Sequence, residues 1–263
     1  MTELPSSIRL INELGERDKR KIYLRLVPDW ILDDFKLERT ALEDDASGLV
    51  SLICPKGSRA VEFSLRANAA DRDPLLYMNI ADTFNGQILV LLVIVNDPMS
   101  PRYHVDVDQF GNNTNFGTTS RNIPAEISAM KDGLAPGQIR RGLRGFRRSV
   151  PVFEAFVQQM GHDLFLIEPL AYHNAIVFER YGFNYSRGLR DMQEIDADFR
   201  IGGSLYNRLN GSNPFRMPEA HASIRGRSWA IHDGILGHPF TGFQMYKRIG
   251  VHANINTFPD AIW

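Results

Sequence analysis

The chain has 263 residues and a formal net charge of -1 at pH 7, so it is long enough to bury a sizeable core and has no overall charge that would attract nucleic acid. Its one cysteine, Cys54, excludes an internal disulfide and a cysteine-based zinc site, and it favours a reducing, cytoplasmic setting. The longest apolar run, Ile88 to Val95, is too short to cross a bilayer as a helix, and the first residues lack the apolar stretch of a secretory signal, so we expect no membrane partner.

Residues 6 to about 40 have the spacing of helices, and the chain then changes to extended segments. Apolar, β-branched runs on either side of the turn residues at 55–57 and at Asn85-Gly86 predict two β-hairpins. Because the run Ile88–Val95 is apolar at every position, we expect this strand to be covered on both faces and to lie centrally in the sheet.

The segment "RYHVDVDQ" alternates cleanly and predicts another strand, with His104, Asp106 and Asp108 on one face. An imidazole beside carboxylates is a donor set for a metal ion, and it is also suited to acid-base catalysis. The plainer interpretation is the polar, exposed face of an edge strand. Residues 109–135 are rich in Gly, Asn, Thr and Ser and predict a long surface excursion.

The second half of the chain returns to helical spacing. One apolar stripe predicts a continuous helix from Ile139 to Met160 that ends at Gly161. The sequence "DLFLIEPL" then predicts a buried strand, residues 171–181 a helix that ends at Gly182, and "FNYSRGL" a further strand. The order of the core is therefore helices, a β meander, helix, strand, helix, strand.

Residues 139–186 resemble the GNAT superfamily of acyl-CoA-dependent N-acyltransferases. The resemblance rests on "AIVFERYGFNY", in which a late helix ends in an aromatic residue, a charged pair and Gly-Phe before the next strand. It covers about residues 48–190. The resemblance implies a mixed sheet that opens between two strands, with the pantetheine arm of acetyl-CoA or another acyl-CoA in the opening and a small-molecule amine as the acceptor.

The sequence departs from the family at the glycine-rich turn that opens the central helix and holds the pyrophosphate of the cofactor. Gly142 and Gly145 are three apart, and Arg144 lies where the second glycine of the family would fall. Because the apolar stripe runs through this segment, we expect its amides to be used already in helical hydrogen bonds.

The arginines of this segment have two interpretations. They form the solvated basic flank of a helix, or the helix begins at "GLAPGQ", where exposed amides and nearby arginines would hold phosphates. The second interpretation predicts a cofactor site made of Gly137, Gln138, Arg140, Arg141 and Arg144.

A second departure concerns the tyrosine that protonates the leaving thiolate in many relatives. The corresponding residue here is Phe178. We expect the nearby Tyr172 and Tyr181 to be core residues and not catalytic residues. His232, Asp233 and His238 form another polar cluster, in which Asp233-Gly234 is typical of a capped turn.

Together these patterns predict an α/β (α+β) protein with a mixed, mainly antiparallel twisted sheet and flanking helices. Residues 1–195 would form the GNAT-like core, and the apolar residues 196–263 an extension that packs over the core, closes a pocket or contacts a second subunit in a homodimer. The first hypothesis is an N-acyltransferase with His104 or Asp106 as the base. The alternatives are a metal-dependent enzyme that uses His104, Asp106 and Asp108, and a non-catalytic binding or dimerising protein.

Overall fold

The computed structural model describes residues 4–44, 47–115 and 119–263 and divides the chain into two compact units. The units interleave along the chain, so the sequence-based division into 1–195 and 196–263 stays a prediction. The first unit comprises Met1–Met99, Gly142–Glu168 and Tyr246–His252. The second unit comprises Ser100–Arg141, Pro169–Met245 and Ala253–Trp263.

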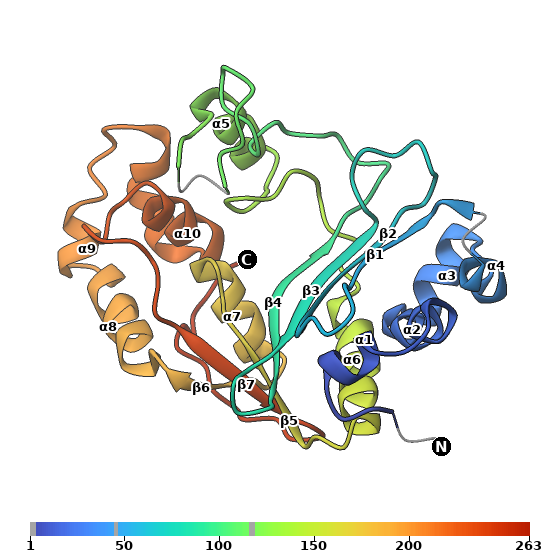
Figure 1. Ribbon diagram of the computed structural model, residues 1–263. Helices are drawn as coiled ribbons and strands as arrows, with labels where there is room; N and C mark the ends of the chain where they lie inside the picture. Colours follow the sequence, from blue (N-terminus) through green and yellow to red (C-terminus); the bar gives the residue numbers. More distant parts are fainter. Residues whose placement is uncertain (1–3, 45–46, 116–118) are drawn as a thin grey trace. The chain divides into compact units, whose positions relative to one another are not determined.

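Within the described residues the strands have the hydrogen-bonded order β1-β2-β3-β4-β5-β7-β6 (Figure 1). Strands β1 to β4 pair antiparallel, and β4 pairs parallel with β5, so the sheet is mixed and mainly antiparallel. This confirms the predicted fold class. The strands are β1 (Val50–Ile53), β2 (Ala60–Leu65), β3 (Leu76–Asp82), β4 (Ile88–Val95), β5 (Leu164–Ile167), β6 (Asn184–Arg187) and β7 (Gln244–Arg248).

Both predicted hairpins are present. The turn before β2 is closed by the Ser58 amide, which donates to the Pro55 carbonyl at 2.9 Å, and Gly57 adopts a left-handed φ of 76° there. Gly86 has a φ of 77° in the turn between β3 and β4. A glycine adopts a left-handed φ without the steric cost of a Cβ atom. The turns therefore form at Gly57 and Gly86, and the strands end there. In the strand order β4 lies between β3 and β5, as predicted for the all-apolar run. The prediction that it is covered on both faces is wrong, because only Ile88 and Val90 are buried and its other residues are half-buried.

Helices of the first unit pack on one face of the sheet. The face of β2 and β3 that carries Val61, Phe63 and Met78 is buried, and α1 contacts both strands. Asp82 at the end of β3 accepts from the amides of Ile8 and Arg9 at 2.8 Å each, which fixes the start of α1. These elements are α1 (Ile8–Asn12), α2 (Glu16–Tyr23), η1 (Leu24–Leu26), α3 (Asp29–Phe35), α4 (Arg39–Glu43) and α6 (Phe146–Gln159).

The prediction of a continuous helix from Ile139 to Met160 is wrong in its first part, because α6 begins only at Phe146. Arg144 has a φ of 54°, which a right-handed helix does not allow. The apolar stripe is real from Phe153 to Met160, where its members are buried. Gly161 ends the helix with a φ of 85°, as predicted.

The predicted strand over "RYHVDVDQ" is also wrong. Residues 102–104 have no regular structure, Val105 and Asp106 form a turn, and a bridge joins Val107 to Asn113. Asp108 accepts from the amides of Phe110 and Asn112 at 2.9 Å each, so its side chain closes a local turn instead of lying on a strand face. Polar and apolar residues therefore alternate in this segment, but among the described residues no neighbouring strand pairs with it to form a sheet.

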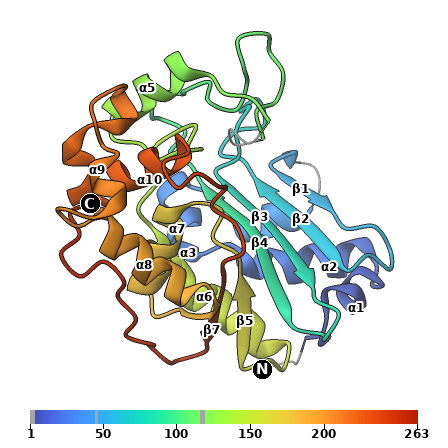
Figure 2. The same cartoon turned by 90° about the vertical axis from the view of Figure 1, so that its left-hand side faces the viewer.

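The second unit is mainly helical (Figure 2). Trp229 and Phe199 are fully buried. The helix and strand predicted around "AIVFERYGFNY" are present as α7 and β6, and Gly182 between them has a φ of 80°. In the described part of the chain, no helix is both long and apolar enough to cross a membrane. The helices of this unit are α5 (Ile123–Lys131), α7 (Tyr172–Arg180), α8 (Leu189–Phe199), α9 (Ser204–Asn207), η3 (Pro214–Arg216), η4 (Pro218–Ala222) and α10 (Ile224–His232).

Candidate functional site

The parallel pair in the first unit is short. Strands β4 and β5 share three register pairs, from Ile88 opposite Phe165 to Val90 opposite Ile167. Strand β5 then ends, and Pro169 follows closely, which has no amide hydrogen to continue a ladder. Strand β4 continues to Val95, so its last residues extend beyond their partner on this side.

A β-bulge marks the point where β4 leaves β5. Asn79 of β3 pairs with Leu92, whereas the next residue, Ile80, pairs with Val90. Leu91 is therefore the extra residue of β4. A bulge bends a strand and increases its local twist, so it can separate the strand from a neighbour beyond that point. Residues 91–95 are only half-buried, unlike Ile88 and Val90, although all of them are apolar.

Helix α6 begins near this open strand with an N-terminus that lacks the usual stabilising groups. Its N-cap is Gly145, which makes no side-chain hydrogen bond, and its first turn contains no acidic residue. Arginines at 147 and 148 lie in this first turn instead. Cations are unfavourable at the positive end of a helix dipole, so this arrangement favours a bound anion.

Arg144 and Arg147 are available for such an anion. Within the described residues, neither guanidinium group takes part in a hydrogen bond or an ion pair, and neither backbone amide donates to a backbone carbonyl. Both side chains are exposed. The sequence-based expectation that the amides of this segment are used in a long helix is corrected, because the helix does not include residues 142–145.

Two close contacts hold the segment before α6 in place. A Cβ atom at Gly142 would lie 3.1 Å from the carbonyl oxygen of Val95, so the backbone approaches the end of β4 closely. A Cβ atom at Gly145 would lie 2.1 Å from the Trp30 ring. The Arg148 guanidinium lies over the same ring, 4.4 Å from its centroid. The N-terminus of α6 is thereby fixed beside the open end of β4.

The predicted cofactor residues fall in two units. Gly137, Gln138, Arg140 and Arg141 belong to the second unit, and Arg144 to the first. No helix begins at "GLAPGQ", which is a correction of that interpretation: α5 ends at Lys131, and residues 132–138 form turns.

The side chains of the second-unit members of this set have local partners. Gln138 accepts from the Ala135 amide at 2.7 Å, Arg140 donates to the Ser100 carbonyl, and Arg141 donates to the Asp132 carbonyl at 3.0 Å. Their role in cofactor binding stays a prediction.

His104 and Asp106 are engaged by Arg102. The guanidinium donates to Asp106 through two nitrogens, at 3.1 Å and 2.6 Å, and lies 2.9 Å from Nδ1 of His104. Because a guanidinium can only donate, that His104 nitrogen must accept. Among the described residues, no group of three or more His, Cys, Asp and Glu side chains is arranged to hold a metal ion. The assignment of His104 or Asp106 as a base, and the metal site with Asp108, stay predictions.

Of the tyrosines near the late helix, Tyr172 and Tyr185 are buried, whereas Tyr181 is half-buried. Tyr172 receives a hydrogen bond from Arg227 at 3.4 Å, and burial raises the pKa of Tyr172 to about 12. Tyr185 donates to Glu179 at 2.6 Å, and Thr257 donates to the same carboxylate through its amide and its hydroxyl. This cluster ties the C-terminal residues to α7.

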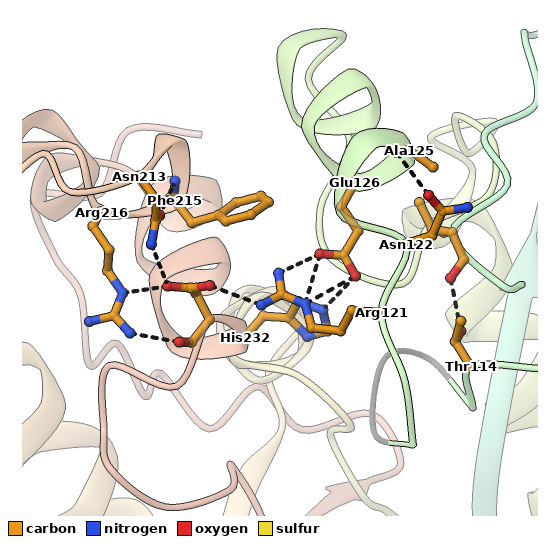
Figure 3. A network of polar contacts seen from close by, with 11 residues as sticks. Thr114, Arg121, Asn122, Ala125, Glu126, Asn213, Phe215, Arg216 and His232 are labelled. Carbon is orange, nitrogen blue, oxygen red and sulfur yellow. Dashed lines mark hydrogen bonds and ion pairs between the residues drawn. The ribbon is translucent and has the colours of Figure 1, made fainter. Parts of the chain in front are cut away.

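The second unit also contains a dense polar network (Figure 3). Arg121 donates to Glu126 on α5, at 2.9 Å from Nε, and to Asp233 at 2.9 Å. Arg216 donates to the other oxygen of Asp233 at 2.7 Å. His232 lies 3.4 Å from Glu126. The network connects α5, η3 and the end of α10.

Charges in this network are balanced. Burial alone would raise the pKa of Glu126, but hydrogen bonds from His232 and Arg121 outweigh burial and hold the pKa below its ordinary value. The pKa of Asp233 is lowered in the same way, against burial, by Arg121, Asn213 and Arg216. Carboxylates that are already paired with guanidinium groups are poor bases, so we assign this network to the packing of the second unit.

Sequence reasoning missed that the helix begins only at Phe146, which places Arg147 in its first turn. The available signal was the pair of glycines in "RRGLRG", which favours a loop at this point over a helix. The chain matches no protein-family model, no curated protein and no solved structure, so the family resemblance of residues 139–186 rests on their sequence motif.

Proposed function

We propose that the first unit binds an acyl-CoA at the open end of β4 and that the chain transfers the acyl group to an amine. The observation that carries this proposal is the combination of a parallel pair that stops at a bulge with an uncapped, arginine-flanked helix N-terminus beside it. The resemblance of residues 139–186 to acyl-CoA-dependent N-acyltransferases points to the same ligand.

The residues present fit the chemistry of coenzyme A. Its pantetheine arm is extended and contains amides, which are the groups that pair with the backbone of an unpaired strand edge such as that of residues 91–95. Its pyrophosphate is an anion suited to the N-terminus of α6, where Arg144 and Arg147 would add charge. The approach of Gly142 to Val95 brings the strand edge and the helix start together.

When bound, an acyl-CoA would supply the acyl group as a thioester. The chain itself would hold the pyrophosphate through α6 and its arginines, and would orient the arm along β4. The N-terminus of α6 and the edge of β4 would both have little freedom to move, because Gly142 and Gly145 are in close contact with Val95 and Trp30.

Calorimetry with coenzyme A and acetyl-CoA tests the proposal. We expect measurable binding by the wild type, and a loss of at least about tenfold in affinity for the double variant Arg144→Glu, Arg147→Glu. The matched control is Arg17→Glu, a charge reversal at another exposed arginine of the first unit, on α2. The difference between the double variant and the control should shrink as salt is added, because the contacts are exposed.

Absence of heat at millimolar coenzyme A for a folded wild type would overturn the proposal. Equal affinities of the double variant and the Arg17 control for coenzyme A would show that the N-terminus of α6 is not part of the binding site. Binding of coenzyme A without transfer to any amine would favour the non-catalytic alternative, which the phenylalanine at position 178 is consistent with.

A further inference from the structure

The second face of the sheet in the first unit carries an ordered polar group. Glu62 on β2 and Asn79 on β3 are register partners, and Tyr77 is two residues before Asn79 on the same face. These side chains are only partly buried, whereas the alternate residues Val61 and Ile80 are fully buried on the other face.

A hydrogen bond joins Tyr77 to Glu62, and Asn79 lies beside both in the strand register. Tyr77 donates its hydroxyl proton to Oε2 of Glu62 at 2.8 Å. Burial and this carboxylate raise the pKa of Tyr77 to about 12, and a hydrogen bond from Asn79 acts in the opposite direction. The phenol is thus neutral at ordinary pH, with its proton directed at Glu62 and its oxygen able to accept.

Asn79 has an acceptor that nothing in the described chain satisfies. Its Oδ1 atom is enclosed and has no hydrogen-bond partner among the described residues. An enclosed amide oxygen without a donor costs about 1–3 kcal/mol, so a ligand that brought a donor to this atom would gain affinity from it.

The register connects this group to the proposed cofactor site. Asn79 pairs with Leu92 and Tyr77 with Ile94, and Leu92 directly follows the bulge residue Leu91. Strand β1 places Ile53 opposite Glu62, and Ile53 is 56% exposed. Among the described residues of the adjacent strands, Tyr77 is the titratable neighbour of Glu62 in this row. The polar group is therefore flanked by apolar side chains on both sides.

We infer that Glu62, Tyr77 and Asn79 form the acceptor site of the protein, and that the acceptor is a primary amine with an apolar substituent. This inference rests on the proposed function. The nitrogen donates a hydrogen bond to Oδ1 of Asn79, the apolar substituent contacts Leu92 and Ile94, and Glu62 is the base.

The transfer step balances with these groups. The bound ammonium first loses one proton to Glu62 through the hydroxyl of Tyr77, which gives up its own proton to the carboxylate as it takes one from nitrogen. The amine then attacks the thioester carbonyl, the N–C bond forms and the C–S bond breaks. The second nitrogen proton leaves to solvent, and the departing thiolate takes a proton from water.

The experiment measures thiol release from acetyl-CoA with 2-phenylethylamine as the probe acceptor and ethanolamine as a polar comparison. For Glu62→Gln we expect kcat to fall at least about a hundredfold, and to keep rising between about pH 7 and pH 9, where the wild type levels off. We expect Tyr77→Phe to lower kcat about tenfold and Asn79→Ala mainly to raise the KM of the amine. Ser64→Ala, a change on the same face opposite Tyr77, is the matched control and should leave both constants unchanged.

Two further measurements keep the outcomes separate. Direct binding of 2-phenylethylamine, measured without cofactor, should weaken in Glu62→Gln and Asn79→Ala. This result does not depend on whether the protein is able to bind coenzyme A. Amine binding at these residues with no binding of coenzyme A would sink the proposed function and leave the acceptor site standing. Turnover that is unchanged in Glu62→Gln but lost in His104→Ala or Asp106→Asn would overturn the inference, as would a wild type that neither binds nor acylates the amine.

Discussion

Gly145 offers a sharp test of how the start of α6 is held. Replacing it by alanine adds a Cβ atom that would lie 2.1, 2.4 and 2.9 Å from three atoms of the Trp30 ring. Ordinary carbon contacts begin near about 3.4 Å, so the ring or the helix must move by roughly 1 Å or more. Because Gly145 has a φ of -87°, the new residue adds no backbone strain, and the clash is the whole effect.

Overpacking of this kind costs about 1–3 kcal/mol, and the lower entropy of the unfolded alanine chain returns about 0.4–1 kcal/mol. We therefore expect Gly145→Ala to lower the free energy of unfolding by about 1–2 kcal/mol, a factor of about 5 to 30 in the unfolding equilibrium. Gly15→Ala is the matched control, because Gly15 is also a helix N-cap with negative φ, and its Cβ atom would meet nothing within 4 Å.

Urea unfolding followed by circular dichroism measures both changes, with and without Trp30→Ala. The penalty at Gly145 should shrink to that of the Gly15 control once the ring is removed. A Gly145→Ala protein as stable as the control, or a penalty that persists without the ring, would refute the placement of α6 against Trp30.

Two predictions concern the pH dependence of stability. Burial lowers the pKa of His173 to about 3 from an ordinary 6.5, so the neutral ring stabilises the fold above about pH 6.5, and this contribution is lost as the pH falls from there toward 3, by at most about 1.4 kcal/mol per pH unit. The stability advantage of the wild type over His173→Leu in urea unfolding should therefore shrink in acid, and an advantage that is constant from pH 7 to pH 4 would contradict this. Burial raises the pKa of Glu179, so its contribution is greatest below its ordinary pKa and falls as the pH rises through the raised value. Relative to the wild type, Glu179→Gln should gain stability as the pH rises above the ordinary carboxyl pKa of 4.5. A change in the opposite direction would show that Tyr185 and Thr257 hold the charged form instead.

The elements that the sequence predicted well are those in which local pattern and packing agree. The hairpins carry glycine at the turn positions that need positive φ, and the helix and strand around Gly182 have the same support. The start of α6 was missed because the apolar stripe continues through residues 139–145, whereas Arg144 adopts a left-handed conformation that no single-residue preference indicates. Gly142 and Gly145, on either side of Arg144, pack closely against Val95 and Trp30, and such contacts between segments distant in the sequence leave no local pattern.

Strand predictions failed where pairing partners decide the outcome. Residues 102–108 alternate as a strand does, yet Arg102 and Asp108 make local contacts and the segment forms no strand. Strand β7 was not predicted, because its five residues combine polar and apolar side chains without a strong pattern. In the candidate site, alternation in "AVEFSL" and "LYMNIAD" already places Glu62 and Asn79 on the polar, half-buried face of their strands, but only the register brings them opposite each other.

Hydrogen exchange followed by mass spectrometry locates the segments to which coenzyme A binds. With saturating coenzyme A, we expect slower exchange in peptides that cover residues 91–95 and 142–148, and little change in peptides from the hairpin turn at 83–87. Protection confined to other segments, or no protection at the end of β4 while coenzyme A is bound, would contradict this expectation.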